Sequence, residues 1–136
     1  MLKEMKGGVV AIVRDPRFTI LSWKTTFEAL KESTENQCVA WNFIANTILS
    51  SRKLGVKIIR YEDLIQNPTS VIEIIANHLG VKAKFRKPLP IIKQLAIEDF
   101  LVTKGISIGS AEVDFMVIER VCGKIAKRFG YTSMHK

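Results

Sequence analysis

One stretch, residues 9–22 with the sequence VVAIVRDPRFTILS, constrains the fold more than any other part of the chain. It opens with an uninterrupted apolar run, residues 9–13, which is typical of a buried strand in a parallel sheet. The run stops at Arg14. Asp15 is a good helix cap, and Pro16 suits the first turn of a helix because that position needs no N–H donor. The stretch therefore predicts a strand, a tight turn and a helix, which indicates the α/β class.

The turn puts candidate anion-binding groups at the carboxyl end of the predicted strand, the edge at which open α/β sheets bind ligands. Arg14 offers a planar guanidinium that suits phosphate. Ser22 lies two turns into the helix, whose N-terminus adds N–H groups and the positive end of the helix dipole. Together these groups can hold one anion. The alternative is that Arg14 pairs with Asp15 or Asp63 and that Ser22 faces solvent.

Residues 56–60 predict a second short strand. Because the chain between the two strands is predicted to be helical, the strands are expected to pair in parallel with a right-handed connection. Tyr61 follows directly, so it is expected at the same carboxyl edge as Arg14. Glu62 and Asp63 are interpreted as structural, since two carboxylates beside a bound phosphate would repel it.

Apolar periodicity and capping residues predict the helices. The expected ranges are 16–31, 35–53, 68–79, 91–101 and 111–129. Asn67 and Ser110 suit N-caps, and Gly55 and Gly80 suit C-caps.

Other features of the sequence bear on its organisation and environment. The 136 residues are expected to form a single domain, with residues 1–8 as a flexible lead-in. A hydrophobic content of 47% excludes an intrinsically disordered chain. No apolar run approaches the roughly 18 residues of a membrane span, and no signal-peptide pattern is present, so we expect a cytoplasmic protein. Cys38 and Cys122 are interpreted as reduced core thiols, and Asn42 and Asn46 as surface positions.

The formal net charge of +8 favours anionic partners, namely a nucleotide, a nucleic acid or an anionic membrane surface. A proline-stiffened loop over residues 82–90 carries one basic cluster and is the best candidate for a flexible or partner-binding segment. A solvated charged face is the alternative. No helix-turn-helix, zinc finger or RNA-binding aromatic pair supports nucleic-acid binding, which we consider the least favoured partner class.

Three motifs in order resemble the sulfotransferase family. VRDPRFTILS resembles its 3'-phosphate-binding motif, in which an RDPR-like turn is followed by a serine eight residues after the first arginine, as Ser22 follows Arg14. Residues 57–81, KIIRYEDLIQNPTSVIEIIANHLGV, look like its second strand, YEDL turn and following helix. Residues 129–131, FGY, are similar to its usual ending.

The resemblance implies an α/β, truncated P-loop-like sulfotransferase fold, with a parallel sheet of about two strands and mainly helical content. It implies a site for 3'-phosphoadenosine-5'-phosphosulfate or adenosine 3',5'-bisphosphate. Arg14 and Ser22 would hold the 3'-phosphate and Tyr61 would lie beside the adenine, unless Tyr61 is packed under the next helix. The family's P-loop-like turn for the 5'-phosphosulfate has no counterpart in residues 1–8, and no catalytic residue is recognised, so we expect binding without catalysis by this chain alone.

A sheet that lacks a neighbouring strand exposes an apolar edge, and such edges invite pairing. We therefore expect a homodimer or larger assembly. Two alternatives stay open: a non-catalytic oligomeric interaction module without nucleotide binding, and a basic nucleic-acid-binding domain.

Overall fold

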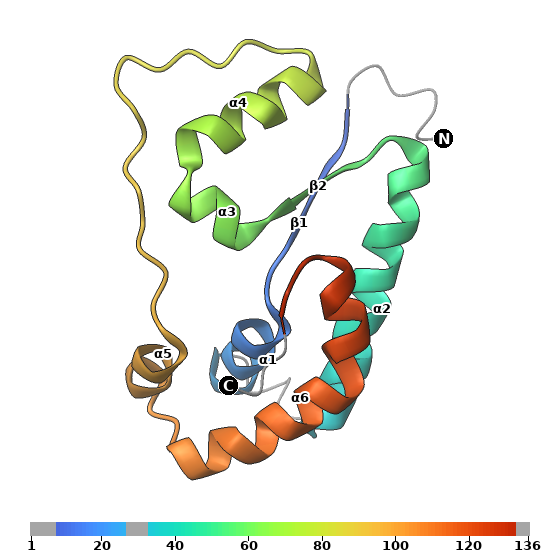
Figure 1. Cartoon of the computed structure of the whole chain (residues 1–136), viewed down its shortest axis with the longest axis vertical. Helices are drawn as coiled ribbons and strands as arrows, with labels where there is room; N and C mark the ends of the chain where they lie inside the picture. The colour runs from blue at the N-terminus through green and yellow to red at the C-terminus, as the bar shows by residue number, and fades with distance from the viewer. Residues whose placement is uncertain (1–7, 27–32, 133–136) are drawn as a thin grey trace. The chain divides into compact units, whose positions relative to one another are not determined.

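The computed structural model describes residues 8–26 and 33–132, which fall into two compact units (Figure 1). The first unit contains residues 8–13 and 47–94, and the second contains residues 14–26, 33–46 and 95–132. Most of the expected lead-in and the last part of the first predicted helix, with Phe27 and Leu30, lie outside the described residues.

The first unit holds a two-stranded parallel sheet, as the sequence predicts. Strand β1 (Val10–Val13) pairs with β2 (Lys57–Arg60), with Ile12 opposite Ile59 and Val13 opposite Arg60. The short helix η3 (Arg52–Leu54) precedes β2, and helices α3 (Tyr61–Gln66) and α4 (Pro68–Leu79) follow it.

Burial differs between the two strands. Ile59 is buried, whereas Ile12 on β1 is 51% exposed, so the expectation of a fully buried first strand is wrong. Helices α3 and α4 pack against β2, which helps to bury Ile59.

The second unit is helical. It contains α1 (Pro16–Thr26), most of α2 (Thr34–Ser51), α5 (Ile97–Lys104) and α6 (Ile108–Arg128). Its core includes residues from α1, α5 and α6, with the rings of Phe18 and Phe100 packed edge to face at 5.0 Å. The buried members of this cluster are Phe18, Leu21, Phe100, Leu101 and Ala111. Buried side chains also line α2 and α6, among them Cys38, Trp41, Ala45, Ile118, Cys122 and Ala126.

Three predicted element boundaries are wrong. The YEDL turn is the start of helix α3. Residues 91–96 are not helical, and the Ile92 N–H donates to the Ile65 carbonyl (2.9 Å), a bond that holds this backbone outside a helix. Helix α6 begins three residues earlier than predicted, because Ser107 is extended (φ −70°, ψ 146°) and its hydroxyl accepts the Ser110 N–H.

The predicted glycine caps are confirmed, since Gly55 and Gly80 have φ of 84° and 72°, the left-handed region that glycine enters without steric cost. Asn67 precedes α4 as expected, with Pro68 at the first helical position. The Asn67 side chain, however, makes no capping hydrogen bond.

Candidate functional site

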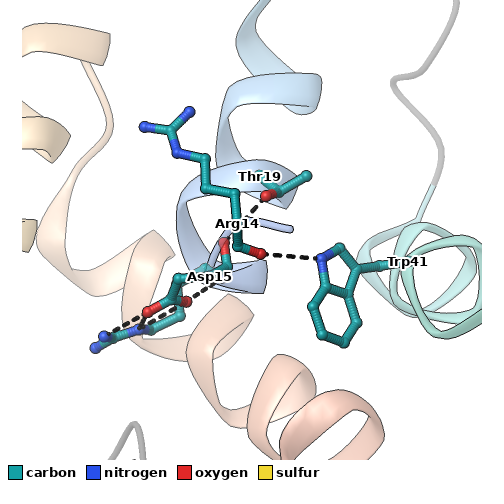
Figure 2. Close-up of polar contacts among 5 residues, drawn as sticks. Arg14, Asp15, Thr19 and Trp41 are labelled. Atoms are coloured by element: carbon teal, nitrogen blue, oxygen red, sulfur yellow. Dashed lines mark hydrogen bonds and ion pairs between the residues drawn. The ribbon is translucent and has the colours of Figure 1, made fainter. Parts of the chain in front are cut away.

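The turn after β1 is held by Asp15. Its carboxylate accepts the backbone N–H of Arg17 at 2.8 Å, the contact expected of a helix N-cap. Its backbone carbonyl accepts the Thr19 N–H at 3.1 Å and the Thr19 hydroxyl at 3.0 Å (Figure 2). Asp15 therefore holds the first turn of α1 through both its side chain and its backbone. The side chain is buried, and the predicted cap is confirmed.

Each of the two carboxylates predicted as alternative partners of Arg14 forms an ion pair with a different arginine. The Asp15 carboxylate pairs with the Arg17 guanidinium at 2.9 Å. Asp63 pairs with Arg60 at 3.0 Å, within the first unit. Figure 2 shows the Arg14 side chain and the Asp15 carboxylate pointing in different directions. These two ion pairs join Asp15 to Arg17 and Asp63 to Arg60.

Arg14 itself is held through its backbone. Its carbonyl accepts the indole N–H of Trp41 on α2 at 3.3 Å, as Figure 2 shows. Its guanidinium carbon lies 5.5 Å from the centre of the Phe18 ring, a cation–π distance. The Arg17 guanidinium lies 6.0 Å from the same ring. Two cationic groups therefore gather at the N-terminus of α1, where the helix dipole is also positive.

Ser22 is half-buried on α1, one helical turn beyond Phe18. Residues four apart lie on the same face of a helix. The Arg14 guanidinium lies over the ring of Phe18, and Ser22 follows Phe18 by one helical turn. The Ser22 carbonyl accepts the Thr25 hydroxyl at 3.2 Å.

Tyr61 is the first residue of α3 and follows the last residue of β2. It is half-buried. It belongs to the first unit, whereas Arg14 and Ser22 belong to the second, so Tyr61 is described apart from them. The next residue, Glu62, is buried, and the Asp63 carboxylate holds Arg60, which agrees with the structural role expected of Asp63.

The sequence reasoning missed several polar contacts within the second unit. Lys24 lies 2.7 Å from the Thr34 hydroxyl and 3.0 Å from both Asp114 oxygens, which ties α1, α2 and α6 together. Asn42, predicted to be a surface position, is half-buried and donates its amide to the Val121 carbonyl at 2.8 Å. Asn46 is exposed, as predicted.

Cys38 and Cys122 are free and fully buried, as predicted. The Cys122 thiol lies 3.6 Å from the Cys38 carbonyl oxygen. A hydrogen bond to the Cys38 side chain, together with burial, raises the pKa of Cys122 well above the usual range of a thiol. Across residues 8–26 and 33–132, no group of three or more His, Cys, Asp or Glu side chains has the arrangement of a metal site. No helix in this part of the chain combines the length and apolar character that crossing a bilayer requires.

The arrangement combines a strand end, a capped helix start with basic side chains, and a serine further along the helix face. In a comparison with protein families, the model of the sulfotransferase domain matches residues 2–104. This chain belongs to the sulfotransferase family. Comparisons with curated proteins and with solved structures found no significant match.

Proposed function

We propose that this sulfotransferase-family chain holds the 3'-phosphate and adenine side of 3'-phosphoadenosine-5'-phosphosulfate or adenosine 3',5'-bisphosphate. The observation that carries the proposal is the position of the Arg14 guanidinium over Phe18, the residue one helical turn before Ser22 on α1. A planar guanidinium donates two parallel hydrogen bonds to phosphate, and a hydroxyl on the same face adds a third donor.

The electrostatics of the α1 N-terminus support an anion at this place. Two guanidinium groups, those of Arg14 and Arg17, lie at the start of α1 beside the single carboxylate of Asp15, so positive charge is in excess there. Arg17 is partly neutralised by Asp15 at 2.9 Å. We assign the phosphate to Arg14 because it is the first arginine of the R-D-P-R motif and its guanidinium lies over Phe18.

Tyr61 is proposed to contact the adenine. A half-buried tyrosine at the carboxyl end of a strand combines a flat apolar ring with a polar hydroxyl, and both suit a nucleobase.

When bound, the donor nucleotide supplies an activated sulfuryl group. Transfer of this group requires donors aimed at the bridging oxygen, where negative charge develops. Arg14 and Ser22 are assigned to the opposite end of the nucleotide, where they bind and orient it. We therefore propose that these 136 residues bind the nucleotide but do not transfer sulfate by themselves.

Calorimetry with two nucleotides tests the Arg14 assignment. Arg14→Ala is expected to weaken binding of adenosine 3',5'-bisphosphate about tenfold to a hundredfold, the value of a charge-assisted hydrogen bond. Adenosine 5'-monophosphate lacks the 3'-phosphate, so its weaker binding should be the same in both proteins. Ser22→Ala should act in the same direction with a smaller effect.

Arg128→Ala removes one exposed positive charge from the end of α6 and is the matched control. If Arg14→Ala and Arg128→Ala weaken the binding of both nucleotides equally, Arg14 contributes only through the net charge of the protein and the proposal is wrong. Sulfate transfer at ordinary enzyme rates by wild-type protein would contradict the non-catalytic part alone.

We also propose that two copies of the chain pair along β1. The described sheet has two strands, so each strand has an edge without a neighbouring strand. Two-stranded sheets are marginally stable alone, and parallel strands are normally covered on both faces. A second β1, antiparallel across a two-fold axis, would cover the exposed Ile12. The free thiols Cys38 and Cys122 support the proposal that the protein works in the reducing cytoplasm.

A further inference from the structure

Residues 81–94, VKAKFRKPLPIIKQ, form a segment of the first unit that contains no helix or strand (Figure 1). We call it the basic segment. It contains five basic residues and no acidic residue. All five basic side chains are exposed: Lys82, Lys84, Arg86, Lys87 and Lys93. Such a run of one sign attracts anionic partners.

Large aliphatic side chains are exposed on the same segment. Ile91 is 72% exposed and Ile92 is 60% exposed, and Val81 is also exposed. Exposure of two adjacent isoleucines to water is unfavourable. Exposed apolar side chains beside a polar, basic cluster are typical of an interaction site.

The segment is held against its own unit at defined points. The Leu89 N–H donates to the Thr69 hydroxyl of α4 at 2.9 Å, and the Ile92 N–H donates to the Ile65 carbonyl of α3 at 2.9 Å. Phe85 and Leu89 are half-buried, whereas the basic side chains and the isoleucines are exposed. Pro88 and Pro90 restrict the backbone between them. The exposed groups are therefore presented with little ordering cost on binding.

We propose that the basic segment is a docking surface for an anionic lipid bilayer. Lysine and arginine side chains are attracted to anionic headgroups, and aliphatic side chains insert at the boundary between headgroups and acyl chains. A nucleic acid fits less well, because single strands are held by aromatic stacking. The aromatic side chain here, Phe85, is half-buried, and the exposed apolar side chains are isoleucines and valine. This proposal does not rest on the nucleotide site proposed above.

Vesicle flotation with the full chain tests this surface. We expect wild-type protein to float with phosphatidylcholine vesicles that contain phosphatidylserine and to stay in solution with phosphatidylcholine alone. Lys84→Gln with Arg86→Gln should lower the partition coefficient about thirtyfold, from about fivefold per basic residue near an anionic surface. Ile91→Ser with Ile92→Ser should lower it about tenfold through lost apolar insertion.

Matched control variants remove the same kinds of exposed side chain from helices α5 and α6. Lys124→Gln with Lys127→Gln takes two exposed charges from α6, and Val102→Ser removes an exposed apolar side chain from α5. Both should retain wild-type partitioning, and circular dichroism should be unchanged in every variant. Equal binding to neutral vesicles, or equal losses in test and control variants, would overturn the proposal. So would the absence of vesicle binding together with binding of an oligonucleotide or of polyglutamate through the same lysines.

Discussion

Asp15 performs two tasks at the start of α1, and both bear on Arg14. Its carboxylate caps the helix through the Arg17 N–H and also pairs with the Arg17 guanidinium. A carboxylate next to a phosphate-binding arginine would normally compete with the phosphate. Here Arg17 engages that carboxylate, so Asp15 and Arg17 form one structural pair within the R-D-P-R motif.

Cys122 gives a prediction about pH. Its folded-state pKa lies above that of an unfolded thiol, about 8.5. Below that pH both states are protonated and the buried pair contributes its full stability. As the pH rises further, the unfolded state releases its proton first, so the free energy of unfolding falls. The same hydrogen bond between the two side chains lowers the pKa of Cys38, so the reference is a variant without either thiol. Between about pH 7.5 and about pH 9.5, wild type should lose about 1 kcal/mol more than Cys38→Ala with Cys122→Ala in urea unfolding. Equal losses would contradict the raised pKa.

At the scale of single residues, local chemistry was predictable and distant contacts were not. The Asp15 cap follows from its position before Pro16 and is confirmed. The bond from Trp41 to the Arg14 carbonyl joins residues 27 positions apart, and the Lys24–Asp114 pair joins residues 90 apart. Such pairs depend on how helices pack, which residue spacing along one helix does not encode.

Among the elements, α6 shows how a helix start is chosen. Both Ser107 and Ser110 have a hydroxyl suited to capping, and the sequence predicts Ser110 as the cap. Ile106, half-buried against the core cluster, fixes the chain just before Ser107. Ser107 is extended and its hydroxyl accepts the Ser110 N–H at 3.3 Å, so the helix begins one turn earlier.

The two serines provide a matched pair of variants. Ser107→Ala should lower the free energy of unfolding by about 1 kcal/mol, because it leaves an N–H of the first turn without its acceptor. Ser110→Ala should change stability by less than about 0.5 kcal/mol, since Ser110 contributes its backbone and not its hydroxyl to the cap. Urea unfolding at one pH measures both. If Ser110→Ala lowers the free energy of unfolding more than Ser107→Ala does, the assignment of the cap to Ser107 is wrong.

Elements with a strong local signal were predictable, and those that depend on tertiary contacts were not. Both strands, their parallel pairing and the glycine ends of η3 and α4 follow from apolar runs and punctuating residues. The predicted helix over residues 91–101 is wrong at its start, because the Ile92 N–H bonds to Ile65 outside any helix.

At the scale of the molecule, the sheet determines how copies are expected to assemble. Among the described residues it contains four residue pairs between β1 and β2. Ile12 on β1 is exposed. Ile12→Lys places a charge on this strand and should convert a dimer into a monomer, since charged side chains on edge strands prevent pairing. Size-exclusion chromatography with light scattering over a range of concentrations measures the change.

Ile74→Lys is the control for that experiment. Ile74 is about as exposed as Ile12 but lies on α4, so the substituted protein should remain a dimer. A wild-type chain that stays monomeric at high concentration would rule out the proposed pairing along β1.

Trp41 has one further consequence. Its indole N–H is bonded to the Arg14 carbonyl, and its ring meets Phe129 edge to face at 6.3 Å. Indole emission responds to the polarity and hydrogen bonding around the ring. With the other tryptophan, Trp23, replaced by phenylalanine, fluorescence becomes an intrinsic optical reporter of the backbone at Arg14. The chain thus carries its own spectroscopic label where strand passes into helix, and events at that turn can be followed in real time without any attached dye.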